Sequence, residues 1–161
     1  MSKHLNEMLQ RWPRMAMQYS HRGRENDDLF HADYDHAGGE TCDGCDAAEL
    51  IKRLPRVDEK EIVVHTGNIA SADQVVRDGR TRDRIAAQEK VICFEMVAAG
   101  LMDNFPSLVI RGICDYADTH KNKGWQRYAA ATASAYAKEL LLAMPATEVA
   151  STNPAKDPVC T

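Results

Sequence analysis

The sequence predicts an α/β fold, with a small, mostly parallel sheet flanked by helices within residues 61–144. Short apolar runs occur at residues 62–65, 91–94 and 108–110, and runs of this kind are typical of buried strands. The segments between and after these runs have the spacing of helices. Because strands and helices alternate along the chain, neighbouring strands are expected to be parallel.

Length, composition and charge set limits on the function. A chain of 161 residues with 44% hydrophobic and 27% charged residues is ordinary for a soluble globular domain. The net charge of −4 argues against a nucleic acid or an anionic membrane as partner. No apolar run approaches the roughly 18 residues of a membrane span. The amino terminus is too polar for a secretory signal, so we expect a cytoplasmic location.

The first 60 residues are predicted to form a helix followed by an irregular segment. Leu5, Met8, Leu9 and Trp12 share one helical face, which needs a partner surface, and Pro13 should end or kink this helix. Residues 20–60 are rich in turn-forming residues. A short helix is expected within residues 47–53, with Asp46 as its N-cap, and a charged linker at 55–60.

Helices are expected at residues 72–76 and 82–88, divided by Asp78 and Gly79, and at 96–102, closed by Phe105 and Pro106. A long helix should follow at 124–144. Its inward face is predicted to contain Trp125, Ala129, Thr132, Ala133, Tyr136 and Leu140. Residues 145–161 have the composition of a flexible tail.

Cysteine and histidine residues raise the question of a metal. The five cysteines are odd in number, and without a secretory signal we expect reduced thiols. Cys42 and Cys45 together with His36 have partial zinc-ligand character, but a structural zinc site needs four ligands. We therefore expect loop thiols and no metal, with zinc as the alternative. His65 is expected in the core, and His120 in a solvated loop.

Polar motifs follow the second and third predicted strands. These are FEMVAAG at residues 94–100 and RGICDYAD at 111–118. Ligands of open α/β sheets bind at the edge where such strands end. From the residues alone, Asp115 has a simpler alternative, which is to cap a loop or to pair with Arg111. Residues 80, 82 and 84 are arginines that resemble a phosphate clamp, although this spacing is more typical of a solvated helix face.

Taken with ADYDHAGG, CDGCD, HTGNIASADQV, TRDR and DNFPSLVIRGICDYADTHKNKGW, these motifs resemble the nucleoside phosphorylase/nucleosidase superfamily. The most similar variant is a domain of fungal multidomain proteins that also contain NACHT, ankyrin or TPR regions. The resemblance runs from about Leu29 to Leu142. It implies the C-terminal half of a three-layer phosphorylase-like domain that acts on the N-glycosidic bond of purine nucleosides. Phosphate or water would be the co-substrate, and no organic cofactor is implied.

The resemblance also implies roles for individual residues. Asp115 matches the catalytic acid that protonates purine N7, so that the base leaves as a neutral group. Met96 matches a methionine that packs against the ribose, and Asn68 lies on the loop that approaches the base. Cys114 stands where relatives often have serine. Phe94 precedes the ribose motif and is grouped with these substrate-binding residues.

Two departures from the family pattern open a second hypothesis. Val97 stands where the family has a glutamate that holds the ribose hydroxyls, and losing two charge-assisted hydrogen bonds costs about 3–6 kcal/mol. No glycine-rich strand-to-helix turn precedes Glu61, so we expect a homo-oligomer or a complementing N-terminal half to complete the fold. The first hypothesis is an enzyme. The alternative is a non-catalytic nucleoside-binding or protein-interaction module.

Overall fold

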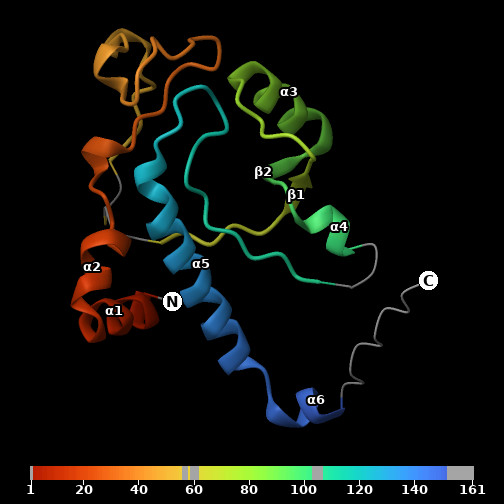
Figure 1. The fold of residues 1–161 in the computed structure, drawn as a ribbon. Coiled ribbons are helices and arrows are strands. Elements are labelled where there is room, and N and C mark those ends of the chain that lie inside the picture. The colour runs from red at the N-terminus through yellow and green to blue at the C-terminus, as the bar shows by residue number, and fades with distance from the viewer. Residues whose placement is uncertain (1, 56–57, 59–61, 103–106, 152–161) are drawn as a thin grey trace.

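The computed structural model describes residues 2–55, 58, 62–102 and 107–151. The predicted helix end at Phe105 and Pro106, part of the linker at 55–60 and the tail beyond residue 151 lie outside this range. The described residues form a mixed helix and strand structure. Figure 1 shows a small sheet with helices α3 and α4 on one side of the molecule and helices α1, α2 and α5 on the other.

The sheet consists of two parallel strands, β1 at Asn68–Ser71 and β2 at Val91–Glu95. Ala70 pairs with Phe94 and Ser71 with Glu95. Helix α3, Gly79–Glu89, connects the strands and contacts β2. The expected strand–helix–strand unit with parallel neighbours is therefore present, and the predicted strand at 91–94 is confirmed.

The other two strands expected from apolar runs are not formed. Residues 62–65 are irregular and largely exposed, His65 included, and β1 lies a few residues further along. Residues 108–110 are also irregular, and Leu108 is 73% exposed. A strand forms only where a neighbour takes up its backbone hydrogen bonds. Within the described residues, β2 pairs with β1 alone, so these two apolar segments have no strand partner.

Helix α3 begins later than the first of its two predicted segments. Residues 72–76 are not helical, because Val75 and Val76 are β-branched and the first good cap is Asp78. The Asp78 side chain accepts a hydrogen bond from the Thr81 N–H at 2.7 Å. A Cβ at Gly79 would lie 2.6 Å from the carbonyl oxygen of Ala32. The absence of a side chain therefore lets α3 pack directly on the irregular segment before it.

Helix α4 is Ala98–Met102, so the helix predicted at 96–102 is confirmed from residue 98 onward. The N-terminal helix is confirmed with its break: α1 is Ser2–Arg11 and α2 is Pro13–Tyr19, with Pro13 in the first turn of α2. Both pack on the long helix α5. On the predicted apolar face Leu5 is buried and Met8 and Leu9 are half-buried, whereas Trp12, just beyond α1, is 54% exposed. Most of this face thus has the partner that its sequence requires.

Helix α5 is Gln126–Ala143, after a 3-10 turn, η4, at Lys123–Trp125. Every residue of its predicted inward face is buried or half-buried. The expected tail is partly helical, because α6 occupies Ala146–Ser151. The N–H groups of Glu148 and Val149 donate to the Pro145 carbonyl and close its first turn. No described helix is both long and apolar enough to cross a membrane.

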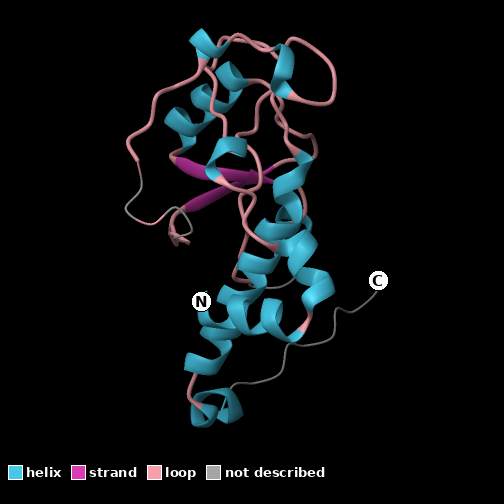
Figure 2. Cartoon of the chain, turned by 90° about the vertical axis from the view of Figure 1, so that its left-hand side faces the viewer, coloured by secondary structure: helices cyan, strands magenta, loops and turns pink. Residues whose placement is uncertain are grey.

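Residues 20–55 are irregular, as expected, and contain the 3-10 turns η1 at Arg24–Asn26, η2 at Cys42–Gly44 and η3 at Ala47–Glu49. The helix expected at 47–53 is only η3, although Asp46 does cap it. An isolated antiparallel bridge joins Phe30 to Leu50. Loops gather at the end of the molecule that contains the two strands, while the opposite end is mostly helical (Figure 2).

Candidate functional site

The candidate site is built on the loop of residues 111–121, which is followed by η4 and then by α5. A Cβ at Gly112 would collide with the backbone of Ala129, so the loop runs directly along this helix. Arg22 donates to the Gly124 carbonyl at 2.9 Å, and the Trp125 indole N–H donates to the Asn26 carbonyl at 2.7 Å. Both bonds tie the turn that follows the loop to residues 22–26, about 100 positions earlier in the sequence.

Asp115 is held as a hydrogen-bond acceptor. Its Oδ1 atom accepts from the Ala117 N–H at 3.0 Å and from the Lys121 ammonium at 3.2 Å, and Oδ2 lies 3.5 Å from the Cys114 thiol. The carboxylate thus caps its own loop, as the simpler interpretation of the sequence expected. Its cation is Lys121 rather than Arg111, whose guanidinium lies 3.9 Å from Glu95.

A groove of about 550 Å³ opens beside Asp115, between the loop, the irregular residues 62–67 and α5. A volume of this size suits a small organic ligand. Cys114 and Asp115 line the groove together with aromatic residues of α5 and the turn before it, namely Trp125, Tyr128 and Tyr136. Burial and the adjacent Asp115 carboxylate raise the pKa of the Cys114 thiol.

The other predicted site residues lie around the sheet and are not among the residues lining this groove. Asn68 begins β1 opposite Val91, and Phe94 is half-buried in β2 opposite Ala70. Met96 and Val97 are exposed in the turn between β2 and α4. The structure therefore brings Cys114 and Asp115 together at the groove and leaves these four positions elsewhere.

Glu95 gives the turn after β2 its own anchor. Its side chain is 1% exposed, and its carboxylate accepts from the N–H groups of Val97 at 2.7 Å and Ala98 at 2.9 Å. Burial by itself would raise the pKa of Glu95. Hydrogen bonds from Ser71, Val97 and Ala98 outweigh burial and hold the pKa below its ordinary value.

A half-buried cluster of Asp27, Arg53 and Tyr116 was not predicted from the sequence. The Tyr116 hydroxyl donates to Asp27 Oδ1 at 2.7 Å, and Arg53 donates to Asp27 Oδ2 at 3.1 Å and to the Tyr116 hydroxyl at 2.5 Å. Burial, and then the Asp27 carboxylate, raise the pKa of Tyr116 to about 12. Tyr116 follows Asp115 directly, so this cluster holds the loop at the residue next to Asp115. No sequence signal joins positions 27, 53 and 116.

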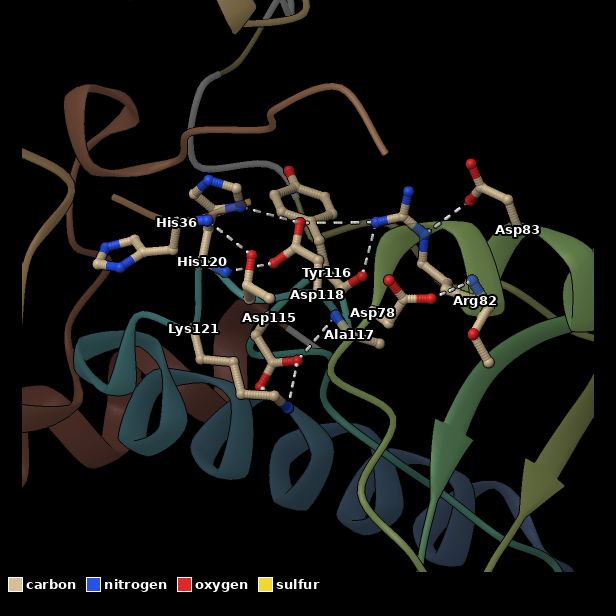
Figure 3. Close-up of polar contacts among 12 residues, drawn as sticks. His36, Asp78, Arg82, Asp83, Asp115, Tyr116, Ala117, Asp118, His120 and Lys121 are labelled. Carbon is tan, nitrogen blue, oxygen red and sulfur yellow. Dashed lines mark hydrogen bonds and ion pairs between the residues drawn. The ribbon is translucent and has the colours of Figure 1, made fainter. Parts of the chain in front are cut away.

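The predicted phosphate clamp does not assemble. Arg80 donates to the Asp33 carbonyl and Arg84 to Gln88, while Arg82 turns to the candidate loop. The Arg82 guanidinium donates to the Tyr116 carbonyl at 2.8 Å and lies 3.6 Å from the Asp118 carboxylate (Figure 3). Asp118 is 5% exposed. Arg82 therefore supports the loop instead of presenting a free cation.

The expectation that His120 is solvated is wrong, since this residue is only 7% exposed. Its ring stacks on Phe30, with centroids 4.2 Å apart, and lies near Tyr34 and His36. Burial lowers the pKa of His120. The aromatic surface supplied by Phe30 explains the difference, because an imidazole ring packs on another flat ring and leaves solvent.

The cysteine loop, residues 36–45, contacts the loop of residues 111–121 beside His120. The His36 backbone N–H donates to the Thr119 hydroxyl at 2.9 Å. The candidate ligand atoms of His36, Cys42 and Cys45 all lie within 4.8 Å of one another, and all three side chains are half-buried. Burial and the neighbouring Cys45 thiol raise the pKa of Cys42 to about 11. Within the described residues the cysteines are free thiols, as expected.

Comparison with known proteins gives one informative similarity. Over 117 residues the chain is 45% identical to a nucleotide-binding leucine-rich repeat (NLR)-like protein of the fungus Hyaloscypha variabilis. This match covers 73% of the chain and 11% of that protein. No protein-family model and no solved structure matches the chain. The similarity is thus to a small part of a much longer fungal NLR-like protein.

Proposed function

We propose that the chain forms part of a nucleoside phosphorylase/nucleosidase-type domain that acts on the N-glycosidic bond of purine nucleosides. The observation that carries this proposal is the position of Asp115, which lines a groove of about 550 Å³. The family motif assigns the acid role to this residue. The similarity to a long fungal NLR-like protein agrees with the fungal multidomain variant to which the motifs point.

The chemistry of the groove supports a flat, partly apolar ligand. Trp125, Tyr128 and Tyr136 contribute aromatic side chains, against which a purine base packs well. Asp115 supplies a hydrogen-bonding carboxyl at the edge of that surface. To act as the acid, Asp115 must separate from the Lys121 ammonium, which contacts both carboxylate oxygens, and take up a proton from solvent that it then passes to N7 of the base. Phosphate or water then attacks the sugar carbon from which the base departs.

A specific observation favours the alternative of nucleoside binding without cleavage. Val97 occupies the position of the ribose-binding glutamate, and a hydrocarbon side chain accepts no hydrogen bond. Val97 is 61% exposed and does not line the groove that contains Asp115. The ribose hydroxyls would then lack their strongest partner. In this alternative Asp115 and the aromatic residues hold the base and no bond is broken.

Base release from adenosine, inosine and methylthioadenosine, with and without phosphate, tests the proposal by chromatography. Asp115→Asn should lower the rate about 10²- to 10⁴-fold, the usual contribution of a general acid. Asp73→Asn, on an exposed bend, is the matched control. Val97→Glu tests whether a carboxylate at this position increases the rate.

Calorimetry with the same nucleosides separates the two hypotheses. Binding that depends on Asp115, without base release even from Val97→Glu, establishes the non-catalytic alternative. Base release that is unchanged in Asp115→Asn contradicts the assigned acid. If the folded chain neither binds these nucleosides nor releases their bases, both hypotheses are overturned.

A further inference from the structure

We propose that His36, Cys42, Cys45 and His120 bind a structural Zn²⁺ ion that joins the cysteine loop to the loop carrying Asp115. The first three residues already place their ligand atoms within 4.8 Å of one another. A tetrahedral zinc with bonds of about 2.0–2.3 Å holds its ligand atoms roughly 3.3–3.8 Å apart. A contraction of about 1 Å in a turn-rich loop therefore brings these three ligand atoms to the spacing that zinc requires. This inference does not depend on the proposed nucleoside chemistry.

The local sequence around the cysteines suits such a site. Cys42 and Cys45 flank Asp43 and Gly44 in the 3-10 turn η2, which the Cys45 N–H closes on the Cys42 carbonyl at 3.0 Å. A turn of this kind directs both thiols to one side, as in the C-x₂-C half of zinc-binding modules. Reduced thiols are the form that a metal requires, and both cysteines are free.

His36 presents a lone pair of the correct kind. Its Nδ1 atom accepts a hydrogen bond from the Gly38 N–H, and Nε2 lies 3.0 Å from the Thr41 carbonyl oxygen. Nε2 therefore carries the proton and Nδ1 the lone pair. Zinc on Nδ1 would take the lone pair that now accepts the Gly38 N–H, so that hydrogen bond breaks, while the bond from Nε2 to a backbone carbonyl stays intact. Hydrogen bonds of this type orient metal-binding histidines.

His120 is the independent observation that points to a ligand. Its side chain is 2% exposed, and neither ring nitrogen has a hydrogen-bond partner among the described residues. Buried polar atoms without partners are rare and call for an explanation, such as an ion. Its ring centroid lies 5.4 Å from that of His36. Two imidazoles on one tetrahedral zinc have centroids about 5 Å apart.

Asp118 completes the arrangement as an outer partner. Its Oδ2 atom lies 3.8 Å from His120 Nδ1, so His120 Nε2 is the atom left to bind the metal (Figure 3). A carboxylate behind a zinc-bound histidine fixes the ring and increases its basicity. The site would therefore connect residues 36–45 to residues 118–120, beside Asp115. Its role is to hold the loop of the candidate site in place.

Elemental analysis of the full purified chain should find one zinc per molecule. Cobalt substitution should give visible ligand-field bands of a tetrahedral ion and a thiolate-to-cobalt charge-transfer band. Cys42→Ser, Cys45→Ser and His36→Ala should lose stoichiometric zinc. His120→Phe keeps a flat ring on Phe30 and removes the nitrogens, so a folded variant without tetrahedral cobalt bands assigns the fourth ligand. Asp118→Asn should bind zinc about 10- to 100-fold more weakly.

Cys93→Ser and His31→Ala are the matched controls, because these residues lie outside the cluster and should keep both the zinc and the cobalt spectrum. Absence of stoichiometric zinc from the folded wild type, even after refolding with Zn²⁺ under reducing conditions, overturns the site. A Cys42–Cys45 disulfide found by mass spectrometry of the protein purified with reductant overturns it as well. An unchanged cobalt spectrum in His120→Phe overturns the four-ligand assignment.

Discussion

The turn after β2 and the loop of residues 111–121 both follow apolar segments and both carry a family motif, yet they are held in different ways. Glu95 fixes the first with the N–H groups of residues two and three positions further along the chain. The second is held by Arg82, His36 and the Asp27–Arg53 pair, which lie 34 to 89 residues away from their partners. The turn after β2 is therefore held mainly by neighbours in sequence, whereas the loop of residues 111–121 is held by contacts that form only in the folded chain.

This difference predicts which substitutions should lower the stability of the whole fold. A change at Glu95 removes contacts within one short segment and its sheet partner. A change in the partners of the 111–121 loop breaks links between segments that are far apart in sequence. We therefore expect the loss of a charged partner of the 111–121 loop to have the largest effect on global stability.

The largest effect is expected for Arg82→Ala. The guanidinium faces Asp118, which is 5% exposed, and donates to the Tyr116 carbonyl. Removing one partner of a buried pair leaves an uncompensated charge and costs about 3–5 kcal/mol. Urea unfolding measures this cost. Arg84→Ala, on the exposed face of the same helix, is the matched control and should stay within about 0.5 kcal/mol of wild type. Equal costs for the two variants would contradict the assigned role of Arg82.

Glu95→Gln should have the next largest effect, about 1–3 kcal/mol at neutral pH, because an amide replaces an acceptor that serves two N–H groups. The folded-state pKa of Glu95 lies below the ordinary value of 4.5. The stability contributed by its ionisation is therefore present above pH 4.5 and is lost as the pH falls through the folded pKa. Denaturant midpoints measured from neutral pH downward should converge for the two proteins. A constant difference down to the acid limit would show that ionised Glu95 is not the cause.

Tyr116→Phe should cost about 1 kcal/mol, because it removes one hydroxyl from a network in which Asp27 and Arg53 remain paired. The raised pKa of Tyr116 adds a test in alkali. Its contribution is fully present below the ordinary value of 10 and is lost as the pH rises toward about 12. The unfolding free energy of wild type should fall in this range more steeply than that of Tyr116→Phe. Tyr19→Phe, at the end of α2, serves as control. Parallel curves for wild type and Tyr116→Phe would refute the assignment.

The smallest effect on stability is expected for Leu108→Lys combined with Ile113→Lys. Both side chains are more than half exposed on segments without a strand partner in the described structure. Exposed apolar groups of this kind favour self-association. Light scattering should show a larger species for wild type and a smaller one for the double variant, with little change in melting temperature. If the wild type is a monomer, the expected homo-oligomer is contradicted.

How much of the fold was predictable depended on the range of the interactions involved. The break between α1 and α2 at Pro13, the inward face of α5 and the β2 strand were all predicted correctly, because each depends on residues a few positions apart. The predictions of strands at 62–65 and 108–110 were wrong. An apolar run shows that burial is favourable, but it does not show which neighbour accepts the backbone hydrogen bonds.

The candidate site divides in the same way. Asp115, Cys114, Cys42 and Cys45 were found from motif and spacing. The burial of His120 against Phe30, and the roles of Arg82 and Tyr116, were not found, because these residues have ordinary local sequences. No pattern within one segment indicates that a ring 90 positions earlier will cover a histidine.

The sequence by itself therefore determined the N-terminal helix with its break at Pro13, most of α3 and α5, the Asp46 cap, the β2 strand and the chemical types present near Asp115. Hydrogen bonds in helices and caps join residues within about four positions, so local sequence suffices to place them. Only the tertiary structure decided which segments pair as strands and which side chains surround the loop of residues 111–121. Those contacts depend on closing long stretches of chain, and the partners of such contacts are set by the packing of the whole fold.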